Sequence, residues 1–384
     1  MIYLDNCSTT RPREEVATVI AKSLLEDFGN PSSLHRLGIR AEKKIKEARA
    51  IISNFLNVED REIYFTSGGT ESNNLAIQSF VRKLSKKGMH IITTKIEHPS
   101  VLNTMKFYEK QGFEITYLDV DDKGYISLSQ LENSMRDDTI LVAVMHVNNE
   151  IGIVEPIMEI GRIIKDKNPN TIFHVDGIQG FGKVDIELKL GKVDSYSFSG
   201  HKVHGPKGIG GLFIDRKHDI EPVIFGGNQE RGIRSGTENL TGIIGFGEAV
   251  RLATENYVKE REHVKELKSY FADKIKAEIK DIRLNSRLDD KSSPYILNIS
   301  FLDTRGEVLL HYLEENGIYV STSSACSSRG TEKSHVLKSI GLGNREIEGA
   351  IRFCFSYENV KEEMDYTVEK LKASVSEIRQ IILR

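Results

Sequence analysis

The chain has 384 residues, a formal net charge of -3, 39% hydrophobic residues and 28% charged residues. This composition is ordinary for a soluble globular protein and excludes collagen-like, mucin-like and largely disordered chains. The length predicts two domains, or one large domain with a smaller companion, and the nearly balanced charge argues against nucleic acid as the main partner.

Short runs of β-branched and aromatic residues alternate with longer amphipathic stretches between residues 36 and 214. This alternation predicts an α/β fold with crossover helices and a mostly parallel sheet. Such a sheet binds its ligand beyond the carboxyl ends of its strands. The predicted helices are 36–56, 71–86, 101–111, 128–136 and 157–167. The predicted strands are 62–66, 90–94, 114–118, 139–146, 171–176, 195–199 and 210–214.

The pattern changes near residue 238 and predicts a smaller α+β domain. We place the domain boundary inside a long helical stretch, so that residues 14–255 form the large domain. Residues 1–13 and 256–384 form the small domain in this interpretation. Its predicted elements are the end of a helix 238–279, a strand 295–300, a helix 305–316, a Ser/Thr-rich loop 321–328, a strand 350–355 and a helix 361–383.

The three cysteines, Cys7, Cys326 and Cys354, are far apart and form no CxxC pair. A structural zinc site or a disulfide framework is therefore not expected. Residues 1–13 lack the basic and then apolar pattern of a signal peptide. No apolar run approaches the roughly 18 residues that a membrane span needs. We expect a cytoplasmic protein with no metal site and no membrane segment.

The lysine after predicted strand 195–199 is the first candidate for catalysis. Lys202 stands in the sequence Ser-Gly-His-Lys, and Pro206 and nearby glycines favour a fixed loop after it. Partial burial and neighbouring cations lower the pKa of a lysine, which suits a Schiff base. The alternative is a solvated loop lysine, and the fixed loop favours a catalytic role.

Two further strand ends carry polar groups. Asp176 ends an apolar strand, and Gln179 follows it closely enough to reach the same ligand. A buried carboxylate needs a partner, for which a cationic pyridine nitrogen or a helix N-terminus would serve equally well.

The segment Thr-Ser-Gly-Gly-Thr-Glu-Ser-Asn-Asn at 66–74 opens a helix whose free N–H groups suit a phosphate. An ordinary capped turn is the alternative, and no Walker motif is present.

Other polar positions follow the same logic. His98 could stack on a ring or move protons, or simply precede a helix that begins at Pro99. Asn149, after another strand, is a candidate hydrogen-bonding group. The Gly-rich loop 231–237 could hold an anion or be a surface turn. Arg352 alternates with apolar residues and could hold a carboxylate bidentately, with a surface salt bridge as the alternative.

Cys326 lies in a run of small polar residues, Ser-Thr-Ser-Ser-Ala-Cys-Ser-Ser-Arg-Gly at 321–330. Such a position predicts an exposed thiol that can react as a thiolate, with an incidental linker cysteine as the alternative. Cys354, between phenylalanines, is expected to pack in its strand. Taken together, the polar strand ends suit one phosphate, one pyridine ring and one aldehyde.

These motifs resemble the NifS/IscS-type cysteine desulfurases of the class V aminotransferase group, which use pyridoxal 5'-phosphate. The resemblance extends from Tyr-Leu-Asp-Asn at 3–6 to Met-Asp-Tyr at 364–366. It implies a fold type I pyridoxal phosphate transferase with a large and a small domain. Its most specific parts are Ser-Gly-His-Lys at 199–202, His-Val-Asp at 174–176 with Gln179, the segment 66–73, Arg-Ser-Gly-Thr at 234–237 and Ser-Ala-Cys at 324–326.

The resemblance also implies a role for each matching residue. Lys202 would hold the cofactor covalently, Asp176 would pair with its ring nitrogen, Gln179 would bond the ring oxygen, and His98 would stack on the ring and act as acid or base. The phosphate would be bound by Gly69, Thr70, Ser199 and His201, and by Thr237 from the neighbouring subunit of a homodimer. The substrate carboxylate region would include Asn30, Asn149 and Arg352.

The implied reaction converts L-cysteine to L-alanine and leaves a persulfide on Cys326. Sulfur would then pass to an acceptor, either an iron–sulfur scaffold or a tRNA-thiolating enzyme, both of which stay open. A selenocysteine lyase, a sulfide-releasing cysteine lyase and a catalytically silent binding protein are the competing functions. The sequence departs from the family where Cys7 and Ser8 replace two alanines and along 355–359.

Overall fold

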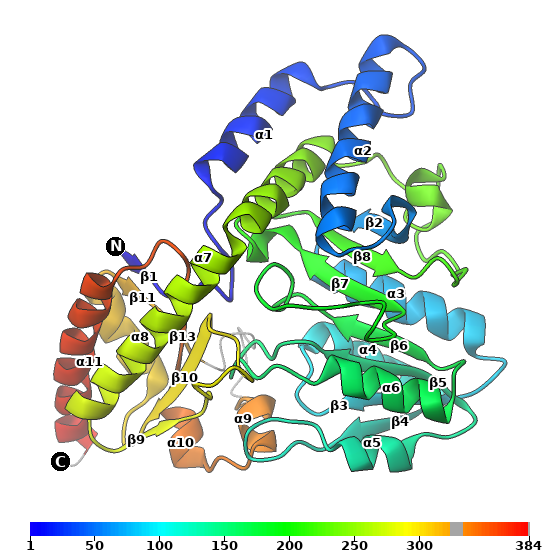
Figure 1. Ribbon diagram of the computed structural model, residues 1–384. Helices are drawn as coiled ribbons and strands as arrows, with labels where there is room; N and C mark the ends of the chain where they lie inside the picture. Colours follow the sequence, from blue (N-terminus) through cyan, green and yellow to red (C-terminus); the bar gives the residue numbers. More distant parts are fainter. Residues whose placement is uncertain (323–332, 383–384) are drawn as a thin grey trace.

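The computed structural model describes residues 1–322 and 333–382 and centres on a seven-stranded sheet (Figure 1). The strand order is β2-β8-β7-β6-β5-β3-β4. Strands β4, β3, β5, β6 and β7 run parallel, whereas β8 is antiparallel to both β7 and β2. The prediction of an α/β fold with a mostly parallel sheet is confirmed. The strands are β2 (Ile63–Thr66), β3 (His90–Thr94), β4 (Glu114–Leu118), β5 (Thr139–Met145), β6 (Ile172–Asp176), β7 (Ser195–Ser199) and β8 (Gly210–Ile214).

The central strands of this sheet are buried along their whole length because helices cover both of its faces. One face packs against α2, α5, α6 and the first part of α7, and the other packs against α3 and α4. The bounds are α2 (Arg36–Phe55), α3 (Gly69–Leu84), α4 (Pro99–Lys110), α5 (Leu128–Ser134), α6 (Ile157–Lys167) and α7 (Leu240–Glu278). Short 3-10 turns occupy η1 (Asp60–Glu62), η2 (Gly200–Lys202) and η3 (Gln229–Gly232).

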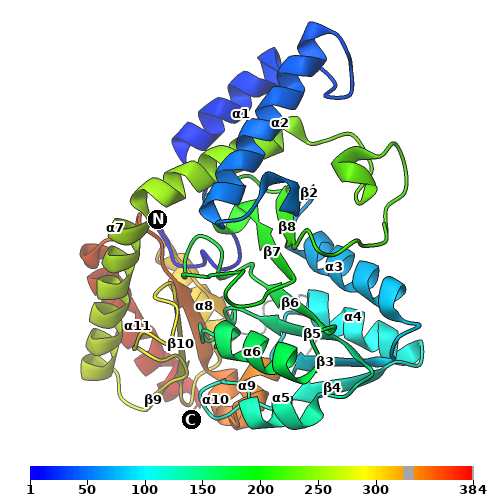
Figure 2. The same cartoon turned by 45° about the vertical axis from the view of Figure 1, so that its right-hand side comes forward.

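A second group of elements lies beside the large sheet, and the 39-residue helix α7 runs from one to the other (Figures 1 and 2). Its four-stranded sheet has the order β12-β13-β10-β9, and its own core includes the end of α7. The remaining bounds are β9 (Ile282–Leu284), β10 (Ile296–Phe301), α8 (Gly306–Glu315), β11 (Ile318–Tyr319), β12 (Ser321–Thr322), α9 (His335–Ser339), α10 (Asn344–Glu348), β13 (Ala350–Cys354) and α11 (Lys361–Ile382).

The N-terminal segment joins this second group, since β1 (Ile2–Tyr3) pairs in parallel with β11. Helix α1 (Glu14–Glu26) then packs against α7 and lies, with the first part of α2, beyond the edge of the large sheet (Figure 1). The sequence analysis did not predict α1, although its apolar residues have helical spacing. Val16 and Ile20, four positions apart, pack against Ala249 and Leu252 of α7. The domain division at residue 255 stays a prediction.

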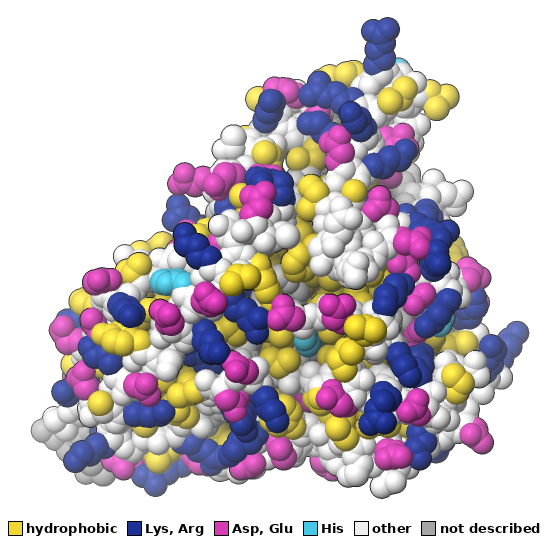
Figure 3. All heavy atoms as spheres, viewed as in Figure 1, with side chains coloured by type: hydrophobic (Ala, Val, Ile, Leu, Met, Phe, Trp, Pro, Cys, Tyr) yellow, Lys and Arg dark blue, Asp and Glu magenta, His cyan; other side chains and the backbone are white. Residues whose placement is uncertain are grey.

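Acidic and basic side chains are mixed over the visible face, with no large region of one sign (Figure 3). None of the helices among the described residues has the length and apolar character required to cross a bilayer.

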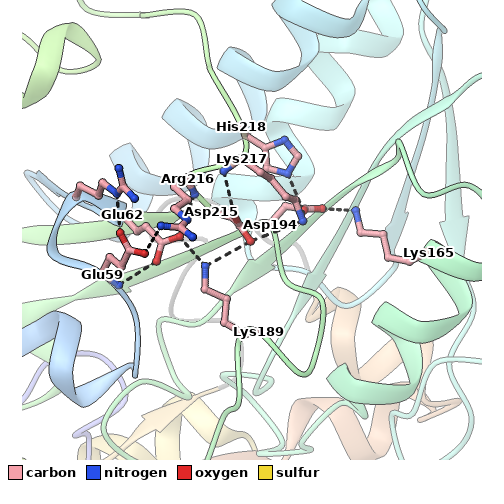
Figure 4. A network of polar contacts seen from close by, with 10 residues as sticks. Glu59, Glu62, Lys165, Lys189, Asp194, Asp215, Arg216, Lys217 and His218 are labelled. Carbon is pink, nitrogen blue, oxygen red and sulfur yellow. Dashed lines mark hydrogen bonds and ion pairs between the residues drawn. The ribbon is translucent and has the colours of Figure 1, made fainter.

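A polar network closes the amino-terminal end of the central sheet (Figure 4). Asp194, directly before β7, has a fully buried carboxylate that pairs with Lys165 at 2.5 Å, Lys217 at 2.8 Å and His218 at 2.7 Å. Its Oδ2 also accepts the Phe173 N–H at 2.7 Å. Burial would raise the pKa of Asp194, but the hydrogen bond from His218 and the neighbouring lysines bring it well below its usual range.

We expect Asp194→Asn to destabilise the protein by about 3–5 kcal/mol at pH 7, because the change leaves the nearly buried Lys165 ammonium without its counter-ion. A depressed carboxylate pKa contributes stability that is fully present above the unfolded pKa of about 3.9 and is lost progressively as the pH falls from there through the folded pKa. The difference between the urea midpoints of the two proteins should therefore be equal at pH 7 and pH 5 and should begin to shrink below about pH 4. Asp219→Asn, which removes a 94% exposed carboxylate, is the matched control and should change stability by less than about 1 kcal/mol.

Candidate active site

A pocket of about 310 Å³ lies where strands β5, β6 and β7 end. Met145, Asp176 and Ser199 are the last residues of these three strands, and all three line the pocket. This is the position that parallel sheets provide for ligands. Other lining residues come from the N-terminal segment, α3, the start of α4 and β13. The lining is Cys7, Ser8, Gly69, Thr70, His98, Met145, Val147, Asn149, Asp176, Ile178, Gln179, Ser199, His201, Lys202 and Arg352.

Lys202 is placed in the pocket by the 3-10 turn that follows β7. Its half-buried side chain reaches the N-terminal segment, where Nζ donates hydrogen bonds to the carbonyl oxygens of Cys7 at 2.5 Å and Ser8 at 2.8 Å. Gln179 Nε2 donates to the same Cys7 oxygen at 2.9 Å. The backbone of residues 7 and 8 therefore orients both Lys202 and Gln179.

Asp176 is held by a chain of hydrogen bonds that begins at His174. Burial lowers the pKa of His174 to about 3, so its ring is neutral. Its Nε2 lies 3.1 Å from Asn73 Oδ1, and Ser197 Oγ donates to the same oxygen at 2.5 Å. These contacts turn the Asn73 amide so that Nδ2 donates to Asp176 Oδ2 at 2.8 Å.

The second oxygen of Asp176 accepts the Ile178 N–H at 3.0 Å. The carboxylate is consequently fixed from two sides at the edge of the pocket. A fixed carboxylate can stabilise a positive charge on a ligand without having to reorganise.

His98 caps helix α4, and its Nδ1 accepts the Ser100 N–H at 3.1 Å. The ring therefore carries its proton on Nε2. Burial lowers the pKa of His98 and outweighs the opposite effect of Asp176, so the neutral ring is favoured at pH 7. Asn73 also donates to Ser100 Oγ at 2.9 Å, which links His98 and Asp176 through one network.

Another group of lining residues suits a phosphate. Gly69 and Thr70 begin helix α3, whose first N–H groups lack helical partners. The buried Ser199 Oγ has no hydrogen-bond partner among the residues that the structure describes. His201 Nδ1 lies 3.1 Å from Thr9 Oγ1, and burial lowers the pKa of His201 to about 4. A hydroxyl without a partner beside a helix N-terminus is a donor available to an anion.

Arg352 brings a buried guanidinium to the same pocket from strand β13, with 3% of its surface exposed. Nη1 donates to the Asn149 carbonyl at 3.0 Å, and Nη2 donates to Asp5 Oδ1 at 3.0 Å and Ser8 Oγ at 2.9 Å. These contacts fix the plane of the guanidinium, which can then bind a carboxylate in one orientation.

This donor set fits pyridoxal 5'-phosphate. The pocket has an amine for the aldehyde at Lys202, a fixed carboxylate for the ring nitrogen at Asp176 and a ring for stacking at His98. It also has the unpartnered Ser199 hydroxyl beside the start of α3 for the phosphate.

The structure brings most of the predicted site residues together, but not all of them. Asn30 lies exposed in the loop between α1 and α2, where its Oδ1 accepts the Ser32 N–H at 2.9 Å, and it does not line this pocket. The exposed Thr237 lies outside the pocket of its own chain, so its assigned role still requires a second subunit. Cys326 lies outside the described residues. The roles of all three stay predictions.

Cys7 and Ser8 line the pocket, although the sequence analysis gave them no role. Their contacts with Lys202, Gln179 and Arg352 use two backbone carbonyls and one hydroxyl. Backbone groups have no sequence signature. The one sequence feature that could have indicated a role is that Cys7 and Ser8 replace two alanines of the family pattern.

Comparison with known proteins agrees with the geometry. The family described as Aminotransferase class-V matches residues 2–367. A protein named cysteine desulfurase IscS from Clostridium botulinum strain Hall is 44% identical over 381 residues, which cover 99% of this chain and 96% of the relative. A protein of the same name from Dictyoglomus turgidum is 43% identical over 380 residues, again covering 99% of this chain and 96% of the relative.

Solved structures show the same fold. A NifS-like protein superposes with a TM-score of 0.92 at 38% identity and covers 98% of this chain and 99% of the other. A NifS-like protein from Rickettsia africae gives a TM-score of 0.87 at 32% identity, with 98% and 99% of the two chains covered.

Proposed function

The chain belongs to the aminotransferase class V family, and from this membership we propose that it is a cysteine desulfurase dependent on pyridoxal 5'-phosphate. The observation that carries the proposal is a single pocket containing Lys202, the fixed carboxylate of Asp176 and the buried guanidinium of Arg352. Arg352 is suited to bind the carboxylate of an amino acid. Lys202 and Asp176 are suited to hold a cofactor near the amino group of that amino acid. Full-length similarity to relatives named cysteine desulfurase supports L-cysteine as the amino acid.

The cofactor would be held at three places. Lys202 would hold its aldehyde carbon, Asp176 would pair with its ring nitrogen, and its phosphate would be bound by Gly69, Thr70, Ser199 and His201. Once bound, the cofactor supplies an electron sink for the α-carbon of the amino acid. His98 and Gln179 are the side chains proposed to contact the ring and its oxygen.

The chain's own groups position the substrate and move its protons. Arg352, with Asn149 beside it, binds the substrate carboxylate. The Lys202 amine would accept the α-proton of the substrate, and the neutral His98 can exchange a proton through Nε2.

Sulfur leaves the substrate through a thiolate attack. The Cys326 sulfur attacks the substrate Sγ, the new S–S bond forms, and the substrate Cβ–Sγ bond breaks. The carbon gains a proton, L-alanine leaves, and Cys326 keeps the extra sulfur as a persulfide.

Sulfur then passes from Cys326 to an acceptor protein. An iron–sulfur scaffold is the acceptor favoured by the IscS name of the relatives, and a tRNA-thiolating enzyme is the second choice. The proposal includes a homodimer in which Thr237 completes the phosphate site of the neighbouring subunit. It also includes the cytoplasm, where reducing conditions keep thiols available.

The proposal is tested with the purified holoenzyme and L-cysteine. We expect L-alanine, together with a persulfide that peptide mass spectrometry assigns to the peptide containing Cys326. Alanine and free sulfide without a persulfide would instead indicate a sulfide-releasing lyase. Turnover of L-selenocysteine alone would indicate a selenocysteine lyase. Bound cofactor with no product from either amino acid would overturn the proposal.

We expect Ser8→Ala to raise KM for L-cysteine about 3- to 10-fold, which corresponds to a lost hydrogen bond of about 0.5–1.5 kcal/mol. Ser8 Oγ accepts from Arg352 Nη2 and donates to Asp5 Oδ1 at 2.8 Å, so its loss loosens the guanidinium. Binding of the carboxylate is equal in the ground and transition states, so kcat should stay within about twofold.

Steady-state kinetics with Ser8→Thr as the control checks this prediction, because threonine retains the hydroxyl. An unchanged KM in Ser8→Ala would show that Asp5 and the Asn149 carbonyl are sufficient to hold Arg352.

A further inference from the structure

Two buried cysteines, one of them in the wall of the pocket, are not used by the proposed reaction. Cys7 and Cys354 are free thiols with 2% and 0% of their surfaces exposed, and Cys7 lines the pocket. Cys354 follows Arg352 by two residues in β13, so both side chains are directed to the same face of that strand. The strand therefore presents a thiol next to the guanidinium proposed to bind the substrate.

The backbone joins the two cysteine segments firmly. The Cys354 N–H donates to the Leu4 carbonyl at 2.7 Å, and Asn6 Nδ2 donates to the Cys354 carbonyl at 2.9 Å. Asp5 and Cys354 also form an isolated parallel β-bridge. Residue 7 is two positions beyond this bridge, so the segment that carries Cys7 starts directly beside Cys354.

Cys7 and Cys354 belong to the same buried cluster of the second core. Burial raises the pKa of Cys7, but the neighbouring Cys354 thiol and the charges of Arg352, Lys183 and Lys202 bring it below the usual value of a thiol. Burial and the Cys7 sulfur raise the pKa of Cys354. One sulfur thus has thiolate character and the other retains its proton.

Lys183 is a buried cation whose charge acts on Cys7. Its side chain is 6% exposed, and Nζ lies 3.5 Å from Gln179 Oε1. A buried ammonium requires compensation, and a nearby thiolate provides it. The surroundings of Cys7 therefore match those of a reactive cysteine, which is electropositive and open to a pocket.

We propose that Cys7 and Cys354 form a redox modification site that closes to a disulfide when a small hydroperoxide enters the pocket. The Cys7 thiolate attacks one oxygen of hydrogen peroxide, the O–O bond breaks, and Cys7 becomes a sulfenic acid while hydroxide leaves and is protonated to water. The Cys354 sulfur then attacks the Cys7 sulfur, the S–O bond breaks, and a second water leaves with the Cys354 proton. Two thiols and one peroxide thus give one disulfide and two waters.

The site is coupled to Lys202 through the backbone of residue 7. The Cys7 carbonyl accepts hydrogen bonds from Lys202 Nζ and Gln179 Nε2. A disulfide restricts the torsions of residue 7 and so changes the position of that carbonyl. Oxidation should therefore shift the visible absorbance of the lysine-bound cofactor, and reduction should restore it.

The test uses the Cys326→Ala holoprotein, in which Cys7 and Cys354 are the only remaining cysteines. One equivalent of hydrogen peroxide should abolish alkylation of both thiols after denaturation and lower the protein mass by two hydrogen atoms. Tryptic digestion should give a peptide pair joined through Cys7 and Cys354, and dithiothreitol should restore both thiols. The measurement needs no desulfurase activity, so its failure is distinct from failure of the proposed function.

Two matched variants are the controls. Cys7→Ser and Cys354→Ser, each combined with Cys326→Ala, should give no joined peptide within one chain. Two alkylatable thiols after peroxide treatment would overturn the proposal, as would a sulfinic acid on Cys7 with Cys354 still reduced. A peptide joining two chains would also overturn it. Presence or absence of the joined peptide in the Cys326→Ala protein tests the disulfide proposal even where a serine variant does not fold.

Discussion

Lys202→Ala is expected to lower kcat for L-cysteine by about 10⁴-fold, the upper end of what a positioned acid–base group contributes. The amine is both the group that bonds the cofactor and the base that takes the substrate α-proton. Its position is specified by two carbonyl contacts at 2.5 and 2.8 Å. Solvent cannot reproduce that arrangement. Single-turnover kinetics with L-cysteine measures the loss.

Lys207→Ala is the matched control for this prediction, because Lys207 is exposed five residues further along the same loop. It should leave kcat unchanged. In Lys202→Ala, phosphate-site contacts should retain the cofactor without a covalent bond, so borohydride reduction before denaturation should leave none of it attached to the protein. A Lys202→Ala protein with nearly normal kcat would contradict the assignment of the amine.

Asp176→Asn is expected to lower kcat by about 10²- to 10³-fold, the typical cost of removing a preorganised electrostatic group. The amide has nearly the shape of the carboxylate, and its oxygen can still accept from Asn73 or Ile178. The negative charge that stabilises a protonated ring nitrogen is lost. The effect should therefore appear in kcat with little change in stability, as measured by kinetics and urea unfolding of the same preparation.

Asp194→Asn is the matched control, because it is expected to change stability and not kcat. It also replaces a buried aspartate next to a strand of the same sheet, but at the opposite end from the pocket. It should lower stability and leave kcat of the folded enzyme unchanged. Equal losses of kcat in the two variants would show that Asp176 acts through folding and not through the ligand.

Much of the large sheet was predictable because its signals are local. Each predicted strand from 62–66 to 210–214 corresponds to an observed strand, with shifts of one residue at Glu62, His146 and Thr171. Buried strands such as β5 are short apolar runs between polar segments, and this pattern does not depend on distant contacts. Lys202 and Asp176 were predictable for the same reason, since each stands at or just after a strand end.

The N-terminal part of the site was not predictable in this way. Cys7 and Ser8 reach Lys202 across 195 and 194 positions of sequence and act mainly through backbone carbonyls. Ser8 and Asp5 reach Arg352 across even longer separations. Helix α1 was also not predicted, and its partner surface is on α7, more than 220 residues further along the chain.

The sequence by itself determined the α/β class, the strand order along the chain and the residue types that a pyridoxal phosphate site requires. These follow from periodicity and from side chains at strand ends, which are properties of neighbouring residues. Only the tertiary structure decided how Asp176 is fixed, which groups orient Lys202 and Arg352, and that Cys7 and Cys354 share one buried cluster. Those arrangements arise where segments from opposite ends of the chain pack together, because contact between distant segments depends on the whole fold.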